Sequence, residues 1–204
     1  MALHSRPGVP TTLSGSARDR VLEIADYRFY ADGIPQTSID AIVAEAGVSV
    51  RAFTKAFSSK EDLVVAYVLQ RHARDVDLFS TISATKLSPH LLFHTLLSEV
   101  IVDVTSPDFR GCAFINAAIE CREYTAVQSV VREHREWYAE AARQVLIDAR
   151  HSRPGDAADD VLLARDGAMV SRYGGDPVAA TSALRRAIER VLREIPASDS
   201  HVSI

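Results

Sequence analysis

Residues 37–57 read TSIDAIVAEAGVSVRAFTKAF, and they contain two short helical patterns separated by a single glycine. In the first pattern the apolar residues share one face. Gly47 ends this pattern, because glycine takes the left-handed conformation without a Cβ penalty. Ser49 is a good N-cap for a second helix that reaches about Phe57. The segment therefore predicts a helix, a tight turn and a second helix.

The second of these helices leaves polar and basic side chains on its outer face. Residues 47–60 contain Arg51, Lys55 and Lys60 and no acidic residue, whereas the whole chain has a net charge of −4 that gives no support to nucleic-acid binding. In a helix-turn-helix the first helix braces against the DNA backbone, and the exposed face of the second enters the major groove. We therefore expect this segment to bind double-stranded DNA. The candidate DNA-binding residues are Thr37, Ser38, Ser49, Val50, Arg51, Thr54, Lys55 and Lys60.

Within this set, Arg51 is the best candidate for reading a base. Its forked guanidinium can bond O6 and N7 of guanine together, which is worth about 1–3 kcal/mol of discrimination. Lys60 and Thr37 would position the protein on the DNA backbone. The alternative is that Arg51 and Lys55 are solvated surface charges and that the serines of the segment are plain helix caps.

Helical periodicity continues on both sides of this segment, from Ala17 to Ile195, and no strand pattern of any length interrupts it. Ser16 and Asp19 predict the start of a first helix that ends at Gly33, and Ser58 and Glu61 predict a capping box for a long helix that reaches about Ile82. Further helices are expected over residues 89–105, 111–120, 126–150, 157–173 and 177–194. The predicted fold class is all-α, with about nine helices.

The predicted organisation has two domains between two tails. Residues 1–16 form a flexible tail whose Arg6 could touch DNA, residues 17–63 the helix-turn-helix domain, residues 64–195 a helical ligand-binding and dimerisation domain, and residues 196–204 a second tail. The first 16 residues lack the apolar stretch of an export signal, and no apolar run is long enough to span a bilayer. We expect a cytoplasmic protein with no membrane partner.

At this point the sequence resembles the TetR family of transcriptional regulators. The resemblance spans about fifty residues through two motifs: Gly33-x3-Thr37-Ser38-Ile39-x2-Ile42-Val43-x2-Ala46-Gly47-Val48-Ser49, then Phe53-x3-Phe57-x-Ser59-Lys60-Glu61-Asp62-Leu63. A second segment, residues 110–120, looks like a stretch seen in one subset of the family. The resemblance implies a repressor that a small-molecule effector releases from a palindromic operator, with the helix over residues 59–82 as the lever.

Three positions depart from the family pattern. Arg51 stands where a glycine is common, Thr54 where a tyrosine is usual and Ala56 where a histidine is frequent. That tyrosine typically reaches a phosphate, so we expect the contact to be weakened at Thr54 or taken over by Lys55. The operator sequence is then expected to be unusual.

The middle of the chain carries a mixture of aromatic and polar residues that could line a ligand cavity. The candidate ligand-binding residues are Phe93, Phe114, Asn116, Glu120, Tyr124 and Trp137, with Phe79 and Tyr138 in the same region. Asn116 and Glu120 lie one turn apart on one helix face. The alternative for the aromatic residues is core packing, and for Asn116 and Glu120 a surface position or a hydrogen bond between helices.

The last two helices carry more apolar residues than one neighbouring helix can cover, which favours a homodimer; the alternative is packing within one subunit. These residues are Val161, Leu162, Ala168, Met169, Val170, Val178, Leu184, Ile188, Val191 and Leu192. In the family, two such helices from each subunit form a four-helix bundle whose two-fold symmetry spaces the recognition helices by about 34–36 Å.

Two other classes of function compete with this interpretation. An enzyme is disfavoured because the chain has no phosphate-binding glycine loop, no zinc motif and no serine elbow, and we expect no catalytic residue, no metal and no cofactor. Cys112 could pair with His90, His94 or His134 as a nucleophile, but Cys112 and Cys121 are more simply reduced thiols in a core, too far apart for a disulfide. The other rival is a helical interaction module with a degenerate DNA-binding head.

Overall fold

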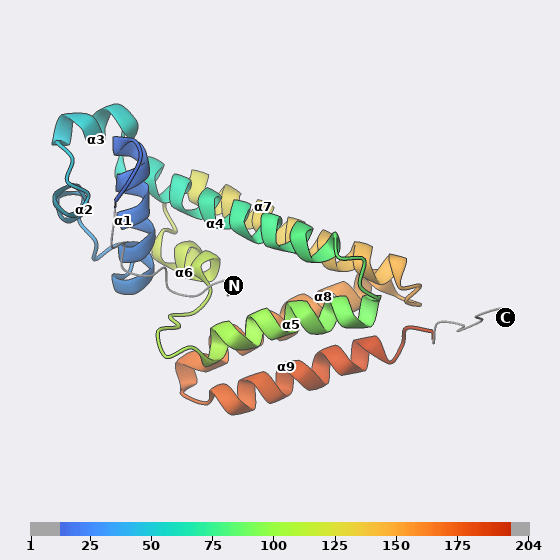
Figure 1. Ribbon diagram of the computed structural model, residues 1–204. Helices are drawn as coiled ribbons and strands as arrows, with labels where there is room; N and C mark the ends of the chain where they lie inside the picture. Colours follow the sequence, from blue (N-terminus) through green and yellow to red (C-terminus); the bar gives the residue numbers. More distant parts are fainter. Residues whose placement is uncertain (1–12, 197–204) are drawn as a thin grey trace.

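The computed structural model describes residues 13–196, and helices account for most of this range (Figure 1). The described residues contain no strand, so the prediction of an all-helical fold with about nine helices is confirmed. The predicted DNA contact of Arg6 and most of both predicted tails lie outside the described residues. The elements are α1 (Ala17–Asp32), α2 (Ile39–Glu45), α3 (Val50–Ala56), α4 (Lys60–Ser83), α5 (Pro89–Thr105), α6 (Ala113–Glu120), α7 (Thr125–Asp148), α8 (Pro154–Ser171), the short 3-10 helix η1 (Arg172–Gly174) and α9 (Pro177–Leu192).

Serine hydroxyls cap the N-termini of helices α1 to α5. Ser16 and Asp19 form the predicted capping box of α1, and each satisfies a backbone N–H group of the other. The predicted box at Ser58 is wrong by one residue. The Ser59 hydroxyl accepts the bond from the Asp62 backbone N–H, while the Asp62 carboxylate accepts from the N–H of Ser58. Adjacent serines followed by adjacent acids fit the motif in either register, and the start of α4 at Lys60 selects the second.

The other predicted boundaries shift by a few residues. Helix α6 starts at Ala113 rather than at residue 111, because Gly111 has a φ of 85° that no helix allows. Helix α8 starts earlier than predicted, at Pro154, since the first turn of a helix tolerates a proline that has no N–H to donate. Helix α5 begins and ends where the sequence predicts.

The helices form a small head and a larger body (Figure 1). In the head, α1 packs against α2, α3 and the start of α4. The long helices α4 and α7 run side by side away from the head, and α8 lies against α7, α9 and α5. One continuous apolar core joins the two parts. None of the helices described combines the length and the apolar character that a bilayer span requires.

A buried ion pair fixes α1 to α4. The Asp26 carboxylate is 1% exposed and accepts bonds from Arg71 Nε at 2.7 Å and from Arg74 Nη1 at 2.6 Å. The Arg71 guanidinium also lies over the rings of Tyr30 and Tyr67, 4.6 and 5.1 Å from their centroids. Breaking such a pair leaves a buried charge uncompensated, so the head cannot turn freely on the first half of α4.

Candidate functional site

The first candidate site is the outer face of α3. Phe53 and Phe57 are buried and hold this short helix against the head, and Gly47 makes the turn before it with a φ of 62°. On the opposite face Val50 is 60% exposed, and Arg51, Thr54 and Lys55 are exposed as well. The structure thus brings these four predicted residues onto one open surface, which is the shape that a recognition helix needs.

The hydroxyl groups of this segment are largely used within the chain. The Ser38 and Ser49 hydroxyls accept bonds from the N–H groups of Ala41 and Ala52, so both residues cap helices while they remain exposed. The Thr54 hydroxyl donates to the carbonyl of Arg51 at 3.1 Å. These groups are at the surface, but their main structural role is local.

Two predicted DNA contacts are placed differently from the others. Thr37 is 5% exposed, and its hydroxyl donates to the carbonyl of Gly33 at 2.8 Å, so this side chain does not present itself to DNA. Lys60 is half-buried, its Nζ lies 3.4 Å from the carbonyl oxygen of Pro35, and burial lowers its pKa. Lys60 therefore ties the start of α4 to the loop after α1.

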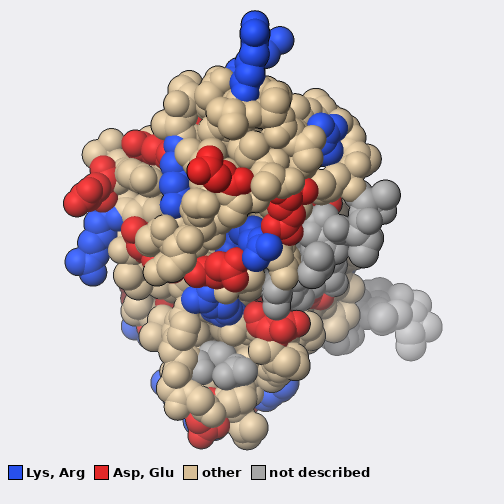
Figure 2. Space-filling model, turned by 90° about the vertical axis from the view of Figure 1, so that its left-hand side faces the viewer, with Lys and Arg blue, Asp and Glu red and all other residues tan. Residues whose placement is uncertain are grey.

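Positive charge is sparse at this end of the molecule. Figure 2 views the end that carries α2 and α3, and its basic side chains are separated by acidic ones and by wide uncharged areas. Arg28 donates to both Asp32 and Glu45, at 3.1 and 2.7 Å, and so adds little to the potential. Among the described residues, the exposed cations near α3 are Arg51 and Lys55 on that helix and Arg18 of α1, whose guanidinium lies 5.1 Å from the Phe57 ring centroid.

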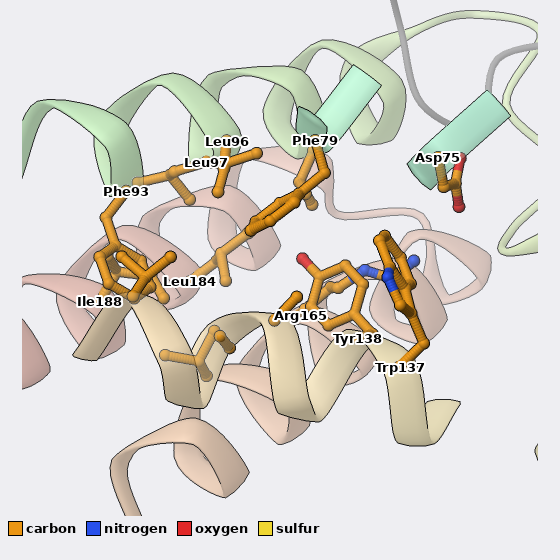
Figure 3. Close-up of a pocket in the computed structure, with 15 residues that line it drawn as sticks. Asp75, Phe79, Phe93, Leu96, Leu97, Trp137, Tyr138, Arg165, Leu184 and Ile188 are labelled. Atoms are coloured by element: carbon orange, nitrogen blue, oxygen red, sulfur yellow. The ribbon is translucent and has the colours of Figure 1, made fainter. Parts of the chain in front are cut away.

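The second candidate site is a cavity in the body, enclosed by α4, α5, α7, α8 and α9 (Figure 3). Its free volume is about 50 Å³, which is room for a few water molecules, so a larger ligand requires side chains to move. Apolar and aromatic residues line most of it, and charged residues stand at one end. The lining residues labelled in Figure 3 are Asp75, Phe79, Phe93, Leu96, Leu97, Trp137, Tyr138, Arg165, Leu184 and Ile188.

The charged end of the cavity has unusual electrostatics. Burial raises the pKa of Asp75 to about 7, so this carboxyl group takes up a proton far more readily than an exposed aspartate. Behind Asp75, His134 borders a neighbouring hollow rather than the cavity, and its Nε2 lies 3.8 Å from the Asp75 carboxylate. Burial lowers the pKa of His134 to about 2, and this neutral ring stacks on Phe114 with centroids 3.5 Å apart. The Arg165 guanidinium lies over the Tyr138 ring, 4.5 Å from its centroid. A buried carboxyl group with a shifted pKa, beside an arginine in an otherwise apolar cavity, is typical of a ligand site.

Only some of the predicted ligand-binding residues line this cavity. Phe93 and Trp137 do, together with Phe79 and Tyr138, whereas Phe114 borders a separate hollow beside α6. Tyr124 lies in a groove between the head and the start of α7.

Asn116 and Glu120 are used for hydrogen bonds instead. Asn116 donates to the carbonyl of Arg110 at 2.7 Å, and its Oδ1 lies 2.7 Å from the Tyr173 hydroxyl. Glu120 Oε2 accepts the backbone N–H of Ile34 at 2.7 Å. For these two residues the structure agrees with the alternative of bonds between parts of the fold.

The sequence predictions missed Asp75 and Arg165. Each lies on a helix face that is otherwise buried, Asp75 after Tyr67, Val68 and Arg71 on α4 and Arg165 between Leu162 and Met169 on α8. A charged residue at a position that the helical period assigns to the core was the available signal.

Helix α6 connects the head to the body at both of its ends. The Tyr30 hydroxyl of α1 accepts the N–H of Arg110 at 3.0 Å and donates to the carbonyl of Gly111 at 3.1 Å. At the other end Glu120 holds the N–H of Ile34, directly after Gly33, whose φ of 94° sets the direction of the loop. The head is therefore held by α6 as well as by α4.

The two cysteines flank α6. Cys112 and Cys121 are buried free thiols, and burial raises the pKa of Cys121 to about 11. This agrees with the prediction of reduced thiols in a core.

The sequence predicts that a partner subunit covers the apolar residues of the last two helices. Most of them are instead buried within one chain, because α8 and α9 pack on each other and on α5. Val170 and Val178 are exceptions, 48% and 73% exposed, and Leu163 on the same side of α8 as Val170 is 62% exposed. The open apolar surface is thus smaller than the sequence suggests.

Comparisons with known proteins agree with this architecture. The family profile described as bacterial regulatory proteins of the tetR family matches residues 22–67. A TetR-family transcriptional regulator from Streptomyces coelicolor has 30% sequence identity and a TM-score of 0.80, over 88% of this chain and 95% of that chain. Among curated proteins, none matches.

Two further solved structures are similar. One, from Streptomyces avermitilis and assigned to the TetR transcriptional regulators, has 25% identity and a TM-score of 0.71 over 85% of this chain and 99% of that chain. A TetR regulator from Legionella pneumophila, at 18% identity, shares the fold with a TM-score of 0.75, over 91% of this chain and 100% of that chain.

Proposed function

Because the chain belongs to the TetR family of transcriptional regulators, we propose that it is a repressor that binds a palindromic operator as a homodimer and leaves it when a small molecule enters the cavity. The observation that carries the DNA-binding part is the open face of α3, where Val50, Arg51, Thr54 and Lys55 are exposed while Phe53 is buried. Residues 17–63 are the DNA-binding part of this proposal and residues 64–195 the sensor.

On DNA, Arg51 reads a guanine and Lys55 contacts a phosphate. Val50 is placed to touch a thymine methyl group, because an apolar side chain exposed on a recognition helix has that use. Thr54 contributes little, since its hydroxyl is already donated to the carbonyl of Arg51.

The dimer forms through α8 and α9. Leu163, Val170 and Val178 are the exposed apolar side chains of this surface, and a two-fold axis there covers them with the same residues of a second copy. The axis places the two copies of α3 about one DNA turn apart, roughly 34–36 Å.

The effector acts through the helices that touch both sites. Helix α4 carries Asp75 and Phe79 at the cavity and begins at Lys60 beside the head, and α6 holds Ile34 through Glu120. A ligand lowers operator affinity only if it binds better to the arrangement in which the two heads are wrongly spaced. Calorimetry in which an effector binds equally well with and without operator would remove this part of the proposal.

The test of DNA binding is a fluorescence anisotropy titration with DNA from the region upstream of the gene. We expect Arg51→Ala to lose about 1–3 kcal/mol of preference at one base pair of each half-site. Lys55→Ala should weaken all sequences alike and reduce the salt slope by about one. Arg143→Ala is the control, because Arg143 is on α7 and pairs with Glu140 far from α3.

The sparse charge of the α3 end keeps one alternative open, a helical interaction module whose DNA-binding head is degenerate. The same titration separates the two. A protein that ignores DNA at low ionic strength supports the interaction module, and steep weakening by salt supports the repressor.

A further inference from the structure

The cavity is divided into an apolar part and a charged part. Phe93, Leu184 and Ile188 lie at one end and Asp75 and Arg165 at the other, with Tyr138 between them (Figure 3). A ligand that fills such a slot has an apolar body and one polar head. The charge of that head depends on what the charged end can accept.

The charged end holds as many guanidinium groups as carboxyl groups. Asp26 is shared by Arg71 and Arg74, and Asp166 is shared by Arg165 and Arg135. The charged or titratable groups that face Asp75 are Arg71 and Arg74 on α4, Asp103 on α5, His134 on α7 and Arg165 on α8. With every carboxyl group ionised the cluster is neutral, so a cationic head would find no unmatched negative charge.

The two charges that line the cavity differ in whether they can be removed. An arginine stays charged at any pH that the protein meets. Burial raises the pKa of Asp75 to about 7, so this group takes up a proton near neutral pH at little cost. The charged end can therefore lose one negative charge but no positive charge.

The aromatic rings of the cavity also disfavour a ligand with a cationic head. The ring of Tyr138 lies between the two ends of the cavity, and the Arg165 guanidinium already lies over it. A ligand cation would have to displace or face that guanidinium, and repulsion between like charges is strong in a buried site.

We propose that the cavity binds a small aliphatic carboxylic acid as its anion, with the chain among Phe93, Leu184 and Ile188 and the carboxylate beside Arg165. The ligand anion takes the place of the Asp75 charge, and Asp75 takes up one proton from the solution, so the total charge of the cluster does not change. This inference rests on the proposed effector response for its regulatory meaning, but the binding itself does not require DNA.

The test is calorimetry of the full chain without DNA, using butanoate, hexanoate and octanoate, with hexanol and hexylammonium as the uncharged and cationic probes of matched length. We expect hexanoate to bind about tenfold or more tightly than hexanol, as one charge-assisted bond would give, and hexylammonium not to bind. At about one pH unit above the Asp75 pKa of about 7, runs in buffers of different ionisation enthalpy should show uptake of close to one proton.

Two variants and one control identify the groups involved. Arg165→Met should abolish the preference for hexanoate, whereas Arg132→Met, the same change on the exposed face of α7, should leave it unchanged. Arg165 is buried and its loss can prevent folding, so Asp75→Asn supplies an independent test. It should keep hexanoate binding and remove the proton uptake.

Tighter binding of hexylammonium than of hexanoate overturns the proposal, as does equal binding of hexanol, binding of no probe, or hexanoate binding without proton uptake. If hexanoate binds as expected but operator affinity does not change, the ligand class stands and the proposed effector response fails.

Discussion

Replacing Glu120 with alanine tests whether the head is held by α6. The Glu120 carboxylate accepts the Ile34 backbone N–H at 2.7 Å in a partly buried position. Hydrogen bonds to charged groups contribute about 1.5–3 kcal/mol, and partial exposure places this one near the lower end. We expect the free energy of unfolding to fall by about 1–2 kcal/mol, which for a chain of this size is a fall in Tm of roughly 3–6 °C.

The same change should weaken operator binding severalfold, because a loosened loop between α1 and α2 lets the two heads depart from the spacing that the DNA requires. Glu123→Ala is the matched control, since it removes the same charge three residues along the chain at an exposed position. Glu120→Gln should lie between the two, because an amide oxygen still accepts the bond without the charge.

Chemical denaturation at one fixed protein concentration and anisotropy with operator DNA are the two measurements, since the apparent stability of a dimer depends on concentration. Equal unfolding free energies for Glu120→Ala and Glu123→Ala would refute the role given to this bond. A loss of stability with unchanged operator affinity would show that the bond holds the fold together but not the spacing of the heads.

Three further predictions follow from the buried charges and the open surface. Arg71→Met leaves a carboxylate of α1 buried without its 2.7 Å partner and should cost about 3–5 kcal/mol in chemical denaturation; a loss below about 1 kcal/mol would contradict a buried pair. Folded Asp75 keeps its proton between its ordinary pKa of 3.8 and about 7, so the wild-type protein loses stability as the pH rises through this window. The free energy of unfolding of Asp75→Asn, relative to that of wild type, should therefore rise by up to about 1.4 kcal/mol per pH unit and then level off above the window. The lowered pKa of His134 acts in the opposite direction below pH 6.5, but His134 is present in both proteins and its contribution cancels. A difference in unfolding free energy between the two proteins that does not change with pH would contradict the raised pKa of Asp75. Leu163→Asp should shift sedimentation from dimer to monomer, whereas Val102→Asp, at an equally open site on α5, should remain dimeric.

The helix-turn-helix could be predicted from the sequence because its determinants are local. Gly47 and the serine caps act on backbone groups within a few residues, and the period of the apolar residues decides which face of α3 is buried. The exposed position of Arg51 and the buried position of Phe53 follow from that period alone. The misplaced cap at Ser58 shows the limit, since two registers of one motif fit the same residues.

The composition of the cavity was decided by the tertiary structure. Asn116 and Glu120 share a helix face, as the sequence predicts, but Glu120 bonds to the head and Asn116 bonds to Arg110 and Tyr173, so neither lies at the cavity. Asp75 and Arg165 are ninety residues apart, and only the packing of α4, α7 and α8 brings them to one cavity. The sequence by itself determined where helices form, to within a few residues at their ends, and which faces are apolar, because these depend on neighbours along the chain. The identity of the groups that meet in the interior depends on how each helix is rotated against the others, and that rotation is set by the core as a whole.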